Sequence, residues 1–243
     1  MMQDIPKTIP ESRLEPGIAG RLAALQTRIH VAEHASARAE GAVNLIAVSK
    51  TQPVSRIRQV YACGQRDFGE NYLQEALVKQ DELMGCDICW HFIGPIQSNK
   101  TRLIASRFDW VHSIDRLKIA ERLSEQRPAD RPPLNVCIQV NVSHELSKGG
   151  VNPAELAALA SAVAMLPGLR LRGLMAIPAP EDDPARQRIP FRVLRQAFDD
   201  LQALGLDTLS MGMSDDLEAA IAEGSTLVRI GTALFGERTK STA

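Results

Sequence analysis

A lysine follows an apolar, strand-like run in the stretch "NLIAVSKTQP", which covers residues 44–53. Desolvating a lysine is costly, so Lys50 either extends its aliphatic stem towards solvent or serves chemistry at the end of the strand. An amine desolvated enough to have a lowered pKa is a good nucleophile towards an aldehyde, with which it forms a Schiff base. Lys50 is therefore a candidate nucleophile, with a solvated strand end as the alternative.

An arginine lies inside a second apolar run, "LVRIG", at residues 227–231. Guanidinium is permanently charged, so Arg229 needs a partner if this run is a buried strand. A salt bridge to a buried carboxylate would supply one. A hydrogen bond to an acceptor on a bound ligand would supply it equally well.

Two loops near the end of the chain carry residues suited to phosphate. Ser214 precedes "DDLE", and we expect it to be the N-cap of a helix over residues 215–223. Gly231 and Thr232 follow the strand that contains Arg229, and they can bring N–H groups and a hydroxyl close to an anion. A Schiff-base lysine, a phosphate cradle and a buried arginine together fit one ligand, pyridoxal 5′-phosphate.

Eight candidate strands alternate with amphipathic segments of helical length, and this alternation predicts βα units in a parallel sheet. We predict a (β/α)8 TIM barrel, in which function lies at the carboxyl ends of the strands. An open doubly wound sheet is the alternative, but its G-x-G-x-x-G motif does not follow the first strand. The predicted strands cover residues 44–49, 66–70, 90–94, 109–114, 135–142, 171–177, 208–213 and 226–231.

The domain organisation is expected to be simple. Residues 1–16 are predicted to form a flexible lead-in, residues 17–238 a single ligand-binding barrel domain, and residues 239–243 a C-terminal tail. Apolar residues at helical spacing predict an extra N-terminal helix over residues 14–38. The proline-rich stretch at residues 178–190 is expected to be a surface loop.

Composition excludes several classes of protein. The formal net charge is -1, so we expect no nucleic acid or anionic membrane as partner. No apolar run approaches the roughly 18 residues of a membrane span, and no signal peptide is evident, so a cytoplasmic protein is expected. Cys86 and Cys89 form a lone C-x-x-C without further zinc ligands, and we predict no metal site. His91, inside the third strand, is expected to be a hydrogen-bonded core residue.

The motifs "AVSKT", "FGENYLQE", "WHFIGPIQSNK", "LRLRGLMAIP" and "GMSDDLEAAIAEGSTLVRIGTALFG" resemble those of the YggS/PROSC family of pyridoxal phosphate homeostasis proteins. The resemblance covers about residues 40–238 and implies a fold like the N-terminal domain of alanine racemase. It implies that Lys50 holds pyridoxal phosphate, that Arg229 faces the pyridine nitrogen and that Asn71 lies beside the cofactor. The full set of cofactor-binding residues predicted in this way is Lys50, Asn71, Ser214, Arg229, Gly231 and Thr232.

The resemblance also implies a role in intracellular vitamin B6 homeostasis without catalysis, with apo enzymes as possible recipients of the cofactor. We therefore predict no catalytic residues. A racemase of low activity is the alternative, but only Tyr61 and Tyr72 could supply the second acid/base that racemisation needs. An arginine facing the ring nitrogen would leave the ring unprotonated, which disfavours transamination and decarboxylation. A cofactor-free lysine aldolase is a third hypothesis. A monomer is expected.

Overall fold

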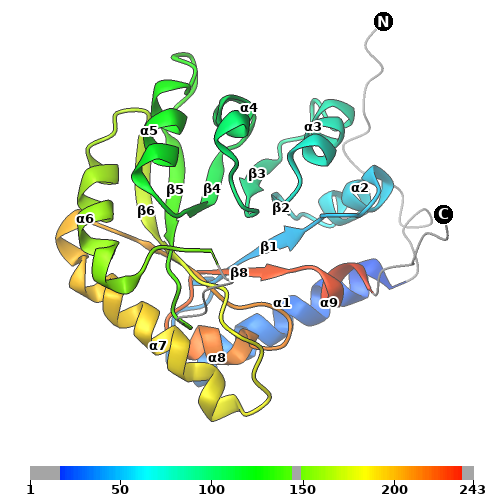
Figure 1. The fold of residues 1–243 in the computed structure, drawn as a ribbon. Coiled ribbons are helices and arrows are strands. Elements are labelled where there is room, and N and C mark those ends of the chain that lie inside the picture. Colours follow the sequence, from blue (N-terminus) through cyan, green and yellow to red (C-terminus); the bar gives the residue numbers. More distant parts are fainter. Residues whose placement is uncertain (1–16, 144–148, 237–243) are drawn as a thin grey trace, which may run out of the picture.

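The computed structural model describes residues 17–143 and 149–236. Eight parallel strands form a closed barrel in chain order, as the sequence predicted, with helices packed around the outside (Figure 1). The strands are β1 (Asn44–Val48), β2 (Asp67–Glu70), β3 (Cys89–Phe92), β4 (Trp110–Ile114), β5 (Leu134–Gln139), β6 (Leu169–Met175), β7 (Thr208–Ser210) and β8 (Leu227–Ile230).

Helices connect successive strands, so each strand is followed by a return segment on the outer layer. A 3-10 turn, η2 (Ser98–Lys100), leads directly into α4, and a second, η3 (Gln202–Leu204), follows α7. The helices after the first are α2 (Val54–Ala62), α3 (Leu73–Glu82), α4 (Thr101–Arg107), α5 (Leu117–Glu125), α6 (Pro153–Ala164), α7 (Pro184–Asp200), α8 (Leu217–Ala222) and α9 (Thr232–Phe235).

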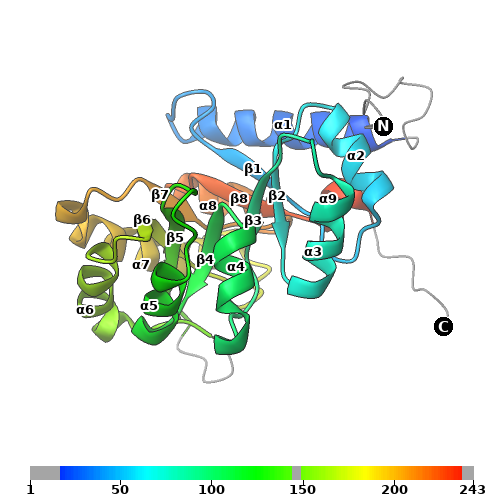
Figure 2. The ribbon, with the colours of Figure 1, turned by 90° about the horizontal axis from the view of Figure 1, so that it is seen from above.

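The predicted N-terminal helix is present as α1 (Ile18–Ala35), ahead of the first strand. Its buried side chains recur at helical spacing, with Ile18, Leu22, Leu25 and Ile29 all facing the core. It packs beside α8, α9 and α2, which makes it part of the outer helical layer (Figures 1 and 2). Residues 14–16 of the predicted helix lie outside the described part of the chain.

The barrel closes where the first strand pairs with the last. In this seam Ile46 lies opposite Arg229, and Ala47 lies opposite Ile230. The carboxyl ends of β1 and β8 therefore lie next to each other. Residues that follow these two strands, far apart in the sequence, meet at one place.

The proline-rich stretch at residues 178–190 is not entirely a surface loop, so that prediction was wrong for its second half. Helix α7 begins at Pro184, because the side chain of Asp183 accepts hydrogen bonds from the N–H groups of Ala185 and Arg186. Proline is favoured at the first position of a helix, where its missing N–H is not needed. Pro190 lies inside the helix. Among the described residues, no helix has the length and hydropathy needed to cross a membrane.

Candidate ligand-binding site at the carboxyl ends of the strands

A cavity of about 520 Å³ opens at the carboxyl ends of the strands, beside the seam between β1 and β8. All of the residues predicted to bind the cofactor line this cavity, although whether each contacts a ligand stays a prediction. The lining residues are Val48, Lys50, Asn71, Ile93, Ile177, Met213, Ser214, Asp215, Arg229, Gly231, Thr232 and Ala233.

Lys50 enters the cavity from a tight turn between β1 and α2. The N–H of Gln52 donates to the carbonyl of Ser49 at 3.0 Å, so Lys50 and Thr51 are the two central residues of the turn. Thr51 has a φ of +64°, a region that turns of this kind usually reserve for glycine or asparagine. The half-buried Lys50 thus projects from a turn whose backbone is strained at the next residue, Thr51.

Asn71 lines the cavity at a point where its backbone passes very close to Gly94, which follows β3 and has no side chain. A Cβ added to Gly94 would lie 2.3 Å from the carbonyl oxygen of Asn71, so only glycine fits there. The hydroxyl of Ser113 donates to the Gly94 carbonyl at 2.5 Å and fixes this crossing. The side-chain oxygen of Asn71 is buried and has no hydrogen-bond partner among the described residues. It is an acceptor available to a ligand donor.

Ser214 lines the cavity, but it is not a helix cap, so that prediction was wrong. Helix α8 begins at Leu217, two residues later than expected. Asp216 instead accepts a hydrogen bond from the N–H of Met213 at 2.5 Å, and this closes a turn that delays the helix. Ser214 lies in that turn with its carbonyl held by Arg28 of α1 at 3.3 Å.

Gly231 and Thr232 lie at the start of α9, a four-residue helix that the sequence did not predict. The first N–H groups of any helix have no partner within the helix, so they are available to a ligand. A Cβ added to Gly231 would lie 3.4 Å from the carbonyl of Val48, an ordinary contact. Glycine therefore leaves more room in the cavity at this position, but a larger residue would not clash with the backbone of Val48.

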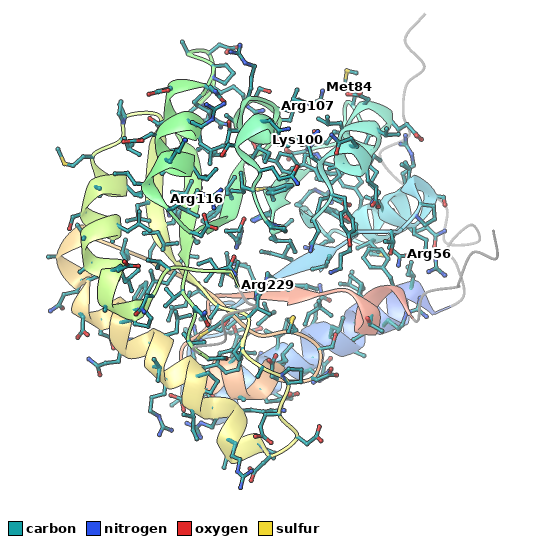
Figure 3. All side chains as sticks on the ribbon, viewed as in Figure 1. Arg56, Met84, Lys100, Arg107, Arg116 and Arg229 are labelled. Atoms are coloured by element: carbon teal, nitrogen blue, oxygen red, sulfur yellow. The ribbon has the colours of Figure 1, made fainter. Side chains whose placement is uncertain are left out.

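Arg229 lies at the centre of the molecule on β8, whereas Arg107 at the end of α4 lies on the outer layer (Figure 3). Its side chain is buried, and the described residues supply it with no salt bridge. Nη1 donates to the hydroxyl of Ser210 at 2.7 Å, and Nη2 donates to the carbonyl of Ala176 at 2.9 Å. Burial lowers the pKa of Arg229 to about 10, with Asp216 opposing the shift, so it is charged at neutral pH.

A hydrogen-bonded chain continues from Arg229 through the inside of the barrel. The Ser210 hydroxyl lies 2.8 Å from Nδ1 of His112. Nε2 of His112 lies 2.9 Å from Nδ1 of His91, and Nε2 of His91 lies 3.0 Å from a carboxylate oxygen of Asp67. The chain thus joins the carboxyl end of β7 to the amino end of β2. His91 is a hydrogen-bonded core residue, as expected.

The carboxylate at one end of this chain fixes its direction. Arginine can only donate and a carboxylate can only accept. With one proton on each imidazole, His91 donates to Asp67, His112 donates to His91, and the Ser210 hydroxyl donates to His112. Burial lowers the pKa of His112 well below 6.5, helped by His91 and Arg229, so its ring is neutral.

Sequence reasoning missed His112 and Ser210, although both are polar residues at the inward positions of apolar strands. The same region brings Cys89 within 3.4 Å of His91 Nε2, and Asp67, Cys89 and His91 lie close enough to share an ion. Cys86 does not belong to this group, and all four cysteines are free. The C-x-x-C pair therefore forms no disulfide, and only Cys89 of the two belongs to the group around His91.

Neither tyrosine lines the cavity. The hydroxyl of Tyr61 accepts a hydrogen bond from the N–H of Asp87 at 3.2 Å, on the outer layer of the barrel. Tyr72 follows Asn71 but is 57% exposed. The polar sequence "NVSHELSKGG" at residues 141–150 suggests a rim over the site, but its residues 144–148 lie outside the described residues.

The fold and cavity define a class of protein: closed eight-stranded parallel barrels with a cavity at the carboxyl ends of the strands and a lysine in its lining. Comparison with known proteins agrees with this class. The family described as alanine racemase, N-terminal domain, matches residues 21–239. A curated relative from Pseudomonas aeruginosa, named pyridoxal phosphate homeostasis protein, is 64% identical over 221 residues, covering 91% of this chain and 96% of the relative. A relative of the same name from Escherichia coli is 56% identical over 226 residues, covering 91% and 97%.

The chain therefore belongs to the family of pyridoxal phosphate homeostasis proteins, within the alanine racemase N-terminal domain fold. Among solved structures, PipY from Synechococcus elongatus with pyridoxal phosphate bound is 41% identical, with a TM-score of 0.79 over 90% of this chain and all of that one. Alanine racemase from Corynebacterium glutamicum, 19% identical with a TM-score of 0.65, covers 93% of this chain and shares the fold; this chain spans 62% of it.

Proposed function

We propose that this protein binds pyridoxal 5′-phosphate through Lys50 and acts in vitamin B6 homeostasis rather than as an enzyme. The observation that carries the proposal is the single cavity that Lys50 shares with Arg229 and the turns after β7 and β8. The shared name of the curated relatives and the ligand of PipY support it.

The residues of the cavity fit the cofactor group by group. Lys50 would hold the cofactor through Nζ, because an amine can condense with an aldehyde with the loss of one water and needs no oxidant or reductant. The Ser214 hydroxyl and the first-turn N–H groups at Gly231 and Thr232 suit a phosphate. Arg229 offers a donor to an unprotonated ring nitrogen, and the side-chain oxygen of Asn71, unpaired within the described part of the chain, offers an acceptor.

When bound, pyridoxal phosphate supplies an electron sink for amino-acid chemistry. The cavity is poorly equipped to use that sink. Arg229 stays charged at neutral pH. It can donate a hydrogen bond to the ring nitrogen, but it keeps its proton, so the ring would remain unprotonated. Among the described lining residues, no tyrosine or histidine is available as a second acid/base. These features favour a protein that holds and supplies the cofactor, with apo enzymes as recipients, over a racemase.

The first test is the absorption spectrum of the purified protein. We expect a visible band from lysine-bound pyridoxal in the native protein and in Lys118→Ala, which removes an exposed lysine on α5. Lys50→Ala should lack the band. If Lys50→Ala keeps it, Lys50 is not the attachment point. If the native protein shows no band after the cofactor is added, the proposal fails.

A second test separates supply from catalysis. The loaded protein is mixed with an apo enzyme that requires pyridoxal phosphate, and the recovered enzyme activity is compared with that from an equal amount of free cofactor. Racemisation of alanine or serine is measured in parallel. Transfer without racemisation fits the proposal, whereas racemisation that disappears in Lys50→Ala would establish the enzyme instead.

A further inference from the structure

A largely buried cluster of charged side chains, formed by Glu70, Glu75 and Lys79, contacts the turn that carries Lys50. Lys79 on α3 is almost fully buried, with a side chain 5% exposed, and Glu70 at the end of β2 is completely buried. Nζ of Lys79 donates to Glu70 at 2.7 Å and to Glu75 at 2.5 Å. Strands β1 and β2 and helix α3 lie side by side in both ribbon views (Figures 1 and 2).

This cluster holds the residues on both sides of Lys50. Nζ of Lys79 also donates to the carbonyl of Ser49 at 2.7 Å, and the Ser49 hydroxyl donates to Glu70 at 2.6 Å. On the other side, the N–H of Thr51 donates to Glu75 at 2.5 Å. Both backbone neighbours of Lys50 are therefore tied to the same set of charges.

The turn needs such support because its backbone is strained. Among the described residues, only Thr51 and Ala37 combine a side chain with a positive φ. A β-branched residue at φ +64° is an outlier that persists only when its surroundings determine it. The hydrogen bonds from Ser49 and Thr51 to the cluster supply that determination.

The same contacts separate the roles of the two lysines. An ammonium group has three N–H donors, and those of Lys79 are matched by Ser49, Glu70 and Glu75. All three N–H groups of Lys79 are thereby engaged by these partners, and Lys79 does not line the cavity. Burial raises the pKa of Glu70, while the charge of Lys79 opposes the shift. Lys50, in contrast, lines the cavity.

We propose that Glu70, Glu75 and Lys79 are positioning residues, which hold the turn between β1 and α2 so that the amine of Lys50 enters the cavity. They do not contact the ligand themselves. The proposal rests on the proposed function, since it assigns Lys50 as the attachment point for pyridoxal phosphate. Because Glu70 immediately precedes Asn71, the same cluster also fixes the chain that leads to this second cavity residue.

Glu75 offers the sharpest test, because its side chain is 30% exposed and its removal leaves the buried pair of Lys79 and Glu70 intact. The variants are Glu75→Ala, which removes the acceptor, and Glu75→Gln, which keeps an oxygen for Thr51. The matched control is Glu155→Ala, since Glu155 is also an acidic residue in the first turn of a barrel helix. A general effect of helix charge would be the same at both positions.

Two readouts are compared: the affinity for pyridoxal phosphate, from absorption titration, and hydrogen exchange of the Thr51 amide in the ligand-free protein. A misplacement of about 1 Å at a reacting group can slow its reaction roughly 100-fold, and attachment to a misplaced Lys50 amine should weaken within the same range. We therefore expect Glu75→Ala to bind about 10- to 100-fold more weakly and to exchange the Thr51 amide faster. Glu75→Gln should recover most of both, and Glu155→Ala should match the native protein.

Lys79→Met serves as the second variant and should show the same two effects more strongly. Equal affinity and equal Thr51 exchange in Glu75→Ala and Glu155→Ala would overturn the positioning role. A native protein that binds no pyridoxal phosphate would instead overturn the proposed function, and the exchange measurement would still report whether the cluster holds the turn.

Discussion

Gly94 provides a sharp test of how the site is assembled. A Cβ at this position would lie 2.3 Å from the carbonyl oxygen of Asn71 and 2.8 Å from its Cα. Comfortable non-bonded contacts need roughly 3.5 Å, so Gly94→Ala must move one of the two chains by about 1 Å. Forcing an additional carbon into a packed site typically costs about 1–3 kcal/mol. Because Asn71 lines the cavity, ligand affinity should fall together with stability.

The matched control is the same substitution at Gly20 in α1, where nothing lies within 4 Å of the added carbon. Alanine is the better helix former by about 0.5–1 kcal/mol, so Gly20→Ala should stabilise the protein and leave affinity unchanged. Urea unfolding gives the two changes in free energy, and absorption titration with pyridoxal phosphate gives the affinities. If Gly94→Ala unfolds and binds like the native protein, the close approach does not hold Asn71 and the reasoning is refuted.

Three further predictions concern polar side chains that the fold hydrogen-bonds. Ser210→Ala leaves the buried partners of this hydroxyl unsatisfied and should cost about 1–3 kcal/mol in urea unfolding, whereas Ser161→Ala on the exposed face of α6 should cost less than about 0.5 kcal/mol. His112 stays neutral in the folded protein, while its unfolded form takes up a proton below pH 6.5, so stability should fall as pH drops through that value. His112→Asn should flatten this part of the pH profile, and an unchanged profile would contradict the assignment. Burial raises the pKa of Asp216, so its contribution to stability is lost as pH rises through the folded pKa. Asp216→Asn keeps an oxygen for the N–H of Met213 and should raise stability at neutral pH, and a lower melting temperature would count against it.

The barrel and its site could be predicted from sequence because both follow from local pattern. Apolar runs of strand length alternate with amphipathic segments, and a closed parallel barrel places all the strand ends on one face. Residues with chemical potential at those ends, such as Lys50 and Arg229, were therefore expected to meet. The structure brings them to one cavity.

The remaining features depend on contacts between distant residues, which no local pattern contains. Ser210 and His112 are 98 positions apart, and only the closed barrel brings them to 2.8 Å. Lys79 lies nine positions after Glu70 on the following helix, and nothing in the sequence marks the two as partners; the fold places them 2.7 Å apart. Local competition decided the helix starts: the side chain of Asp183 made a cap among prolines, whereas Asp216 closed a turn.

The seam between β1 and β8 has a consequence for how the protein is made. On the ribosome, Lys50 emerges with the first strand, but Arg229 and the turn at Gly231 emerge with the last. A growing chain therefore carries the amine of Lys50 long before it has a cavity to receive a ligand. A ligand that binds only when both strands are paired favours the closed barrel by mass action. Pyridoxal phosphate should therefore stabilise the pairing of β1 with β8 and slow its opening.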